Sequence, residues 1–337
     1  DETRILAKSA LAGLLVGVTF LLIELALDEP IKRFVTNNIV VLFDLGPKNV
    51  RIVDGELAGL PAFILNRNVT SLVLLLIPGL LFASALAERV KRHVVLAGLL
   101  LGATACVLIS ESGTSVMAFF VGAAVLALAA LSLKAARVLL MAGWTAAILL
   151  AVPLAGLPYE LGWNRWTFLP PDSVAARFYI WKNFADEVAK HPVGGTGIRG
   201  ARALDVRLPA DLGSLGEPAP KADGRRVPHP HNVFLQIWLE LGAIGAFLAL
   251  GVGLAALWQM RKLPRLLEIA ASGLFAVCAA VAASGFDLWQ TWLLTSYAFT
   301  WAALLLAAGL PALAPEAAKS PRSGASGNPP LRVTRPC

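Results

Sequence analysis

The sequence is poor in charge and in cysteine. Charged residues make up 15% of its 337 residues, against about a quarter in a typical soluble domain, while 57% are hydrophobic. This balance excludes an ordinary soluble domain and indicates a polytopic membrane protein. The three cysteines, Cys106, Cys278 and Cys337, show no Cys-x-x-Cys or Cys/His metal spacing, so we expect neither a disulfide framework nor a metal site.

Other signals are also missing. There is no signal-peptide pattern, and the chain begins with Asp1 rather than Met, as expected for a fragment or for numbering from an internal residue. The long connections contain no Asp-x-Asp metal pair, and the glycine turn at 194–197 lacks the flanking strand and helix of a nucleotide fingerprint. The net charge of +7 is too unevenly distributed to mark a nucleic-acid surface. We therefore expect no metal, no cofactor, no nucleotide and no nucleic-acid partner.

Long hydrophobic runs are abundant, and they predict an all-α, polytopic helical membrane protein. Basic residues gather in alternate connections, whereas the short turns at 110–114 and 285–291 carry no Lys or Arg. By the positive-inside rule we expect both ends of the chain in the cytoplasm and the long connections 28–68 and 156–232 outside. Eight runs have spanning length, at residues 5–27, 69–87, 94–109, 115–133, 136–155, 233–258, 266–284 and 293–310.

These runs divide the chain into four regions. Residues 1–155 are predicted to form five transmembrane helices, and residues 156–232 a large periplasmic loop. Residues 233–310 are predicted to form three more transmembrane helices, and residues 311–337 a disordered cytoplasmic tail. The segment 31–61 is expected to be irregular or partly amphipathic on the outer surface.

The periplasmic loop is predicted to contain one amphipathic helix, with Arg177 beside its apolar stripe. The stripe consists of residues that recur at helical spacing after a helix-start signal at 170–173: Val174, Phe178, Trp181, Phe184 and Val188. The following stretch 198–226 is basic and rich in Gly and Pro, so we expect a mobile loop.

The stretch 227–245 carries the clearest functional signal. A turn containing Pro228 and Pro230 presents His229 and His231, and an apolar helix of spanning length starts at once. The unpaired N–H groups and the dipole at a helix N-terminus disfavour a positive charge. A histidine there tends to stay neutral near pH 7, which is the form that a general base needs. A helix-capping or lipid-interface histidine is the alternative.

Polar residues continue into this helix. Asn232, Gln236 and Glu240 repeat at every fourth position, and such a stripe is predicted to face the bundle interior or a wet cavity. Small residues at 242, 245, 249 and 253 predict close helix packing. At the outer mouth of the second span lies Arg67, for which a snorkelling anchor is the alternative to a functional role.

Three local patterns coincide with those of a known family. Asn66-Arg67 opens a span, Arg177-Phe-Tyr-Ile-Trp181 precedes His191-Pro192-Val-Gly-Gly-Thr-Gly197, and His231-Asn232-Val-Phe-Leu-Gln236 leads into Trp238, Glu240, Gly242 and Gly245. In this order they resemble the bacterial O-antigen ligase family, within the wider group of O-antigen ligases and polymerases. The similarity covers most of the chain. Family members usually have more spans, so N-terminal ones would be missing here, and many carry an arginine in the turn equivalent to 110–114, which has none.

The resemblance implies a GT-C-type glycosyltransferase in the bacterial inner membrane, with its active site facing the periplasm. It would move O-antigen from undecaprenyl diphosphate onto lipid A–core, by an inverting reaction that needs no metal. Our hypothesis is that His231 is the general base, that Arg67 and Arg177 bind the diphosphate, and that Asn232 binds or orients substrate. The arginines between 199 and 226 would meet phosphates of the acceptor or form a solvated basic surface.

Other functions are compatible with parts of this pattern. An O-antigen polymerase would use the same lipid-linked donor with a second lipid-linked glycan as acceptor, and a protein O-oligosaccharyltransferase would glycosylate pilin or another protein. A transporter or flippase would use the charges of Glu24, Glu240 and Asp287. A purely structural membrane scaffold would have no need of His231 together with the outer arginines.

Overall fold

The computed structural model describes residues 2–38, 51–53, 56–59, 62–163, 172–208 and 226–313. The predicted disordered tail beyond residue 313, together with Arg225, lies outside the described residues. Helices dominate, and one short hairpin joins them. In chain order the elements are α1 (Glu2–Ala26), α2 (Pro30–Asn38), β1 (Arg51–Val53), β2 (Glu56–Gly59), α3 (Ala62–Leu86), α4 (Arg89–Ile109), α5 (Gly113–Leu131), α6 (Leu133–Leu149), α7 (Leu157–Glu160), α8 (Asp172–Val188), the 3-10 helix η4 (Gly200–Ala203), α9 (Val233–Met260), α10 (Arg265–Ser284) and α11 (Thr291–Ala308).

Seven of the described helices are long and apolar enough to cross a membrane: α1, α3, α4, α5, α9, α10 and α11. They confirm the prediction of a polytopic helical membrane protein. The fifth predicted run, 136–155, forms the shorter α6, whose 17 residues end at Leu149. Turns follow up to residue 155, because Pro153 has no N–H to donate and disfavours the helical conformation in the residue before it.

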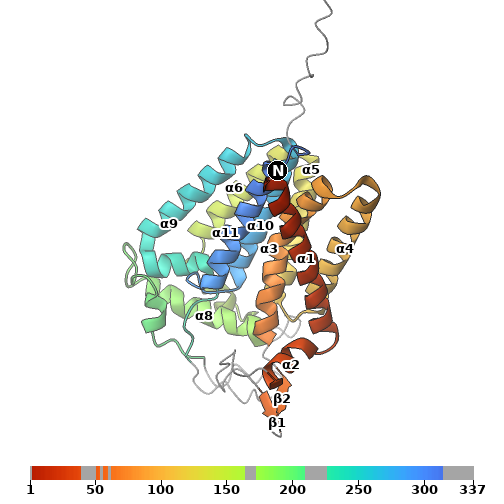
Figure 1. Cartoon of the computed structure of the whole chain (residues 1–337). Coiled ribbons are helices and arrows are strands. Elements are labelled where there is room, and N and C mark those ends of the chain that lie inside the picture. The colour runs from red at the N-terminus through yellow and green to blue at the C-terminus, as the bar shows by residue number, and fades with distance from the viewer. Residues whose placement is uncertain are drawn as a thin grey trace, which may run out of the picture.

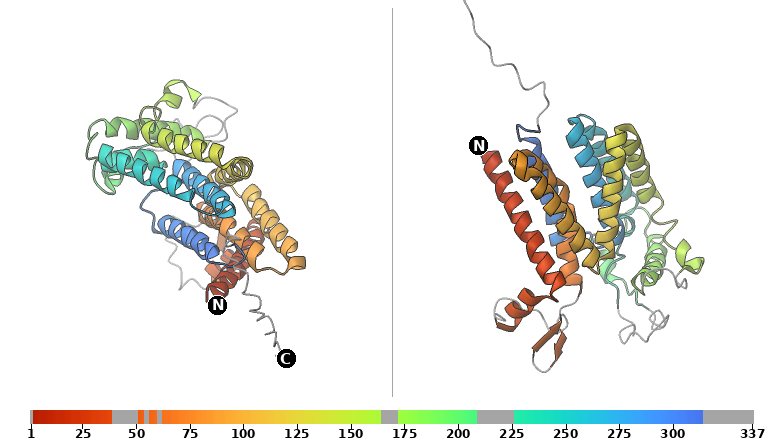
Figure 2. Two further views of the ribbon diagram at one scale, coloured as in Figure 1. Left: turned by 90° about the horizontal axis from the view of Figure 1, so that it is seen from above. Right: turned by 90° about the vertical axis from the view of Figure 1, so that its right-hand side faces the viewer.

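The helices form a bundle with two distinct ends (Figures 1 and 2). The N-terminus and the α3–α4 and α9–α10 connections lie at one end, whereas α2, the hairpin and α8 lie at the other. The two connections at the N-terminal end are among those in which the sequence concentrates Lys and Arg. The bundle therefore has the one-sided basic distribution that the positive-inside rule uses.

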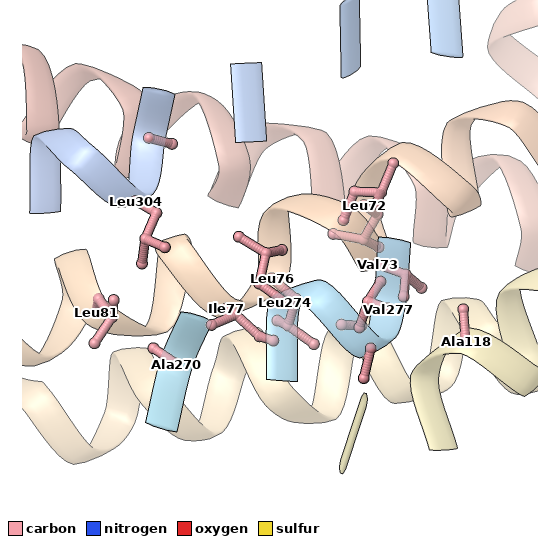
Figure 3. Close-up of a cluster of buried hydrophobic side chains, with 14 of the residues drawn as sticks. Leu72, Val73, Leu76, Ile77, Leu81, Ala118, Ala270, Leu274, Val277 and Leu304 are labelled. Atoms are coloured by element: carbon pink, nitrogen blue, oxygen red, sulfur yellow. The ribbon is translucent and has the colours of Figure 1, made fainter. Parts of the chain in front are cut away.

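At the centre of the bundle α3 packs against α10 (Figure 3). Val73 and Ile77 of α3 lie against Leu274 and Val277 of α10, and all four side chains are buried. Close packing of α10 against α5 relies on Gly122, where an added Cβ would lie 2.4 Å from the Val277 side chain. Small residues allow such close approach, which supplies the van der Waals contact that holds helices together in lipid.

The segment after α1 has more regular structure than predicted. It forms α2 and the antiparallel pair β1–β2. Glu24, near the end of α1, is fully buried and accepts hydrogen bonds from the N–H groups of Ile31 at 2.8 Å and Lys32 at 3.3 Å. A carboxylate is favourable at a helix N-terminus, so Glu24 caps α2.

The helix predicted to run straight through 233–258 is broken. Gly242 has φ 63° and ψ −161°, and Figure 1 shows α9 bending sharply so that its first part lies across the end of the bundle beside α8. Only glycine fits there, because a Cβ would lie 2.2 Å from the carbonyl oxygen of Val193. After the break, Ala249 and Gly253 pack on Trp144 of α6. The helix that His231 precedes therefore begins as a transverse segment.

Candidate functional site

His231 is held in one orientation from a distant part of the chain. Its Nδ1 lies 3.0 Å from the carbonyl oxygen of Gly285, the residue that ends α10. A carbonyl oxygen can only accept, so Nδ1 carries the proton and, in the neutral ring, Nε2 is the acceptor nitrogen. The backbone of His231 has φ 53°, a left-handed conformation that is uncommon outside glycine and asparagine. The ring is half-buried and offers the tautomer that a general base requires.

A second imidazole supports this turn. The His229 ring lies 4.1 Å from the His231 ring, centroid to centroid, and its Nδ1 accepts the backbone N–H of His231 at 3.3 Å. On the other side, Trp181 of α8 donates from Nε1 to the carbonyl oxygen of Pro230 at 2.9 Å. Burial, together with the neighbouring charge of His231, lowers the pKa of His229 to about 3. His229 is therefore neutral at physiological pH and acts as an acceptor that positions His231.

The buried neutral state of His229 predicts a pH-dependent stability. Between pH 6.5 and about 3 the unfolded chain binds a proton at His229 and the folded chain does not. The free energy of unfolding should therefore fall as pH is lowered through that window. We expect His229→Asn to flatten this dependence, because the amide oxygen can still accept the His231 N–H but does not titrate. Thermal unfolding in detergent between pH 4 and 7 measures the difference; equal slopes for the two proteins would contradict it.

The polar stripe of α9 does not line a wet cavity. Gln236 and Glu240 are each 1% exposed and form a polar cluster with Asp287, which we call the Glu240 hub. Gln236 donates from Nε2 to Glu240 at 3.1 Å and to Asp287 at 2.8 Å, and its Oε1 accepts the Leu288 N–H at 2.9 Å. Trp289 Nε1 also donates to the Glu240 carboxylate. The hub thus joins the first part of α9 to the α10–α11 connection, which begins at Gly285.

The same carboxylate organises the loop after α8. Glu240 accepts hydrogen bonds from the N–H groups of Arg199 at 2.9 Å and Ala201 at 3.3 Å, and its backbone carbonyl accepts the Gly197 N–H at 2.9 Å. A Cβ at Gly195 would lie 2.4 Å from the backbone of Glu240, so the glycine turn packs directly on α9. The prediction of a mobile loop is therefore wrong for residues 198–208, while 209–225 lie outside the described residues.

The arginines of this loop are engaged within the protein. Arg202 Nη2 lies 2.6 Å from Asp287 Oδ2. Burial opposes ionisation of Asp287, but the hydrogen bonds from Arg202 and Gln236 hold the pKa of Asp287 below its ordinary value. Arg207 pairs with Asp205, and Arg226 donates to two backbone carbonyls at the end of η4. A freely solvated basic surface is therefore the wrong description of Arg202 and Arg226. With Glu24, Glu240 and Asp287 all in structural contacts, the transporter interpretation loses its support.

Removing the charge of Glu240 should loosen the loop. The Glu240 carboxylate offers two acceptor oxygens to its donors, whereas the amide in Glu240→Gln offers only one. We therefore expect the free energy of unfolding to fall by about 2–3 kcal/mol. The amides of Arg199 and Ala201 should exchange with solvent faster, which hydrogen–deuterium exchange measures. Asp186→Asn is the matched control, because that carboxylate is exposed and pairs only with Lys182. If these amides exchanged at the same rate in Glu240→Gln as in the unaltered protein, the Glu240 hub would not stabilise the loop.

Arg177 forms no hydrogen bond or ion pair with the other residues that the structure describes. It lies on α8 one turn before Trp181, is half-buried, and among the described residues no carboxylate or carbonyl oxygen bonds to its guanidinium. Burial lowers the pKa of Arg177, although a guanidinium still remains charged. A buried charge without a partner is costly, so this side chain suits an anionic ligand.

Arg67 comes from a different helix and contacts an aromatic side chain of α11. It lies in the second turn of α3, with Cζ 5.8 Å from the ring centroid of Trp292 at the start of α11. The Trp292 ring lies 4.7 Å from that of Phe286, the residue after Gly285. One chain of contacts therefore joins Arg67 to the carbonyl that orients His231. Another joins Arg177, through its helix and Trp181, to Pro230.

The turn at 110–114 supports the site without an arginine. Ser112 accepts the Ser115 N–H at 3.3 Å and so caps α5, and the Ser115 hydroxyl lies 2.9 Å from that of Thr70, one turn after Arg67. Thr114 donates to the carbonyl oxygen of Ser284 at 3.1 Å. The side chains of Ser112, Thr114 and Ser115 are all buried. The hydroxyls of this region therefore cap α5 and tie α3 to the end of α10.

Asn232 begins α9. Its Oδ1 accepts the Leu235 N–H at 3.2 Å, so it is the N-cap of the helix. It also lines, with Trp181, an apolar pocket of about 380 Å³ between α6 and α9. Its role toward substrate stays a prediction. The supporting roles of His229, Trp181 and Gly285 were not predicted. Trp181 was identified as part of an apolar stripe and of the Arg177–Trp181 pattern, and Gly285 carries no signal in the sequence.

Comparison with known proteins identifies relatives. Residues 96–250, which include Arg177, His231 and Asn232 but not Arg67, match the family described as O-Antigen ligase. A Rickettsia felis protein, provisionally named a polysaccharide ligase, is 30% identical over 128 residues, 37% of this chain and 30% of that protein. A Rickettsia bellii protein of the same name is 28% identical over 192 residues, 56% of this chain and 45% of that protein. The chain therefore spans less than half the length of these relatives.

Proposed function

We propose that this chain, whose residues 96–250 match the O-antigen ligase family, catalyses transfer of O-antigen from undecaprenyl diphosphate to lipid A–core, as a metal-independent, inverting glycosyltransferase of the bacterial inner membrane. The observation that carries the proposal is the bond from His231 Nδ1 to Gly285, which presents Nε2 as the acceptor nitrogen. The two flanking arginines supply the counter-charge that a diphosphate needs.

The reaction follows from these groups. His231 Nε2 takes the proton of an acceptor sugar hydroxyl as its oxygen attacks the anomeric carbon of the donor. The bond from that carbon to the diphosphate oxygen breaks, and undecaprenyl diphosphate leaves with the electron pair. Arg67 and Arg177 stabilise the charge that develops on the leaving group. Attack from the face opposite the leaving group inverts the anomeric centre.

The proposed location of the site explains the choice of donor. The first part of α9, which His231 precedes, lies beside α8 at the bundle end opposite the basic connections, and we propose that this end faces the periplasm. Nucleotide sugars are made in the cytoplasm, so a site on this side requires a donor that is already activated and held in the membrane. A lipid-linked diphosphate meets both conditions.

Transfer by the purified protein tests the proposal. Lipid A–core and undecaprenyl-diphosphate-linked O-antigen are supplied in EDTA, and we expect a gel shift of lipid A–core to the size of the ligated product. Elongation of the lipid-linked glycan alone would identify a polymerase instead. Transfer that stops in EDTA and returns with a divalent ion would contradict the metal-independent mechanism.

A further inference from the structure

An apolar groove of about 510 Å³ runs along the bundle between α1, α3 and α11. Figure 1 shows these three helices side by side, with α1 and α11 close together at the N-terminal end and apart toward the end that carries α8. On α3 the groove extends from Asn68 to Phe82, which is about 21 Å at the rise of an α-helix. The groove is therefore long enough to extend through most of the thickness of the membrane's hydrocarbon core.

Two glycines of α1 open this groove. A Cβ added at Gly13 or Gly17 would meet no atom within 4 Å. Some glycines of the bundle serve close packing instead: at Gly102 a Cβ would lie 2.6 Å from Val18, and at Gly122 2.4 Å from Val277. Gly98 and Gly251 are as open as Gly13 and Gly17, but they do not line the groove. Gly13 and Gly17 therefore widen the groove, because a larger side chain at either position would occupy part of its volume.

The groove is polar at the end where a headgroup would lie. Asn68 and Ser71 line it at the outer end of α3, and the rest of its length is formed mainly by apolar side chains such as Phe20, Phe82 and Phe299. Arg67 immediately precedes Asn68, and its guanidinium lies over Trp292. An amphiphile with an anionic head and one long apolar chain matches this order of groups.

We propose that this groove holds the polyisoprenyl chain of the donor, with the first phosphate at Arg67. The inference rests on the proposed function and adds a path to it: the carrier lies along α1, α3 and α11, and its diphosphate is held at Arg67. Arg67 contacts Trp292, which packs on Phe286, the residue after the Gly285 that orients His231. Binding energy from the chain would position the diphosphate before the acceptor arrives.

Filling the groove tests the proposal. Leucine at both glycine positions, Gly13→Leu with Gly17→Leu, places a Cβ where no atom lies within 4 Å, extends a side chain into the groove and raises helix propensity. We expect the Kd of the purified full chain for undecaprenyl diphosphate to rise at least tenfold, with an unchanged or higher melting temperature. The matched control is Gly98→Leu with Gly251→Leu, because these glycines of α4 and α9 are equally open but lie outside the groove. The control should bind as the unaltered protein does.

Each other result contradicts the groove assignment. Equal affinity in the two double variants, with transfer still dependent on His231, overturns the groove and leaves the proposed function intact. Equal competition by phosphatidylglycerol vesicles identifies a general lipid site, and a change of oligomeric mass in the groove variant identifies a second copy of the chain. An unaltered protein that neither binds undecaprenyl diphosphate nor transfers glycan would instead overturn the proposed function itself.

Discussion

Replacing His231 with asparagine is expected to lower the rate of glycan transfer by about 10²–10⁴, with little change in stability. Asparagine tolerates the left-handed backbone at φ 53°, and its amide can still donate to the carbonyl oxygen of Gly285. What it lacks is a basic nitrogen in the position of Nε2. The rate of a single turnover with saturating donor measures the loss, and thermal unfolding in detergent checks the fold.

A histidine of the adjacent loop provides the control. His191 is exposed, and only its backbone is hydrogen-bonded among the described residues, so His191→Asn should transfer glycan at the unaltered rate. His231→Ala removes the Gly285 contact as well and should be as inactive and somewhat less stable. A fully active and well-folded His231→Asn protein would exclude His231 as the base.

The second large effect is expected at Arg177, where both Arg177→Lys and Arg177→Ala should reduce transfer by about 10²–10³. The guanidinium is half-buried on α8 and has no partner among the described residues, so its proposed ligand is the diphosphate. Lysine keeps the charge but not the planar pair of donors that binds two phosphate oxygens at once. The lysine variant should therefore resemble the alanine variant, in the rate of transfer and in the KM for the donor.

Lys182→Ala is the control on the same helix. Lys182 pairs with the exposed Asp186 and lies outside the proposed site, so its loss should leave transfer and the donor KM unchanged. If Arg177→Lys were fully active, Arg177 would be a plain electrostatic anchor. If Arg177→Ala failed only because the protein unfolds, the melting temperature would fall with the activity, whereas a diphosphate ligand predicts loss of activity alone.

Much of the fold follows from local sequence. The bundle depends on runs of apolar residues, and α8 depends on side chains such as Phe178 and Phe184 that recur at helical spacing. Helix starts at Ser112 and Asn232 follow from short polar side chains that accept a nearby N–H. The Asp-Gly dipeptide at 54–55, between β1 and β2, is a hairpin signal that the prediction of an irregular segment overlooked. Each of these features involves only a few consecutive turns of chain.

The arrangement of the candidate site depends on contacts between residues far apart in the chain. Gly242 was predicted to allow close helix packing, but it is the residue at which α9 is broken. Glycine is required there because the carbonyl of Val193 occupies the space of a Cβ. Glu240 was predicted to face the bundle interior or a wet cavity; it is buried in the interior, and its partners, the N–H groups of Arg199 and Ala201, could not be predicted from the sequence. Nothing near His231 in the sequence predicts that Gly285 sets its tautomer. Composition and periodicity determined which segments are helices; only the folded bundle decided which polar groups meet, because a buried donor must bond to whichever acceptor packing brings within reach.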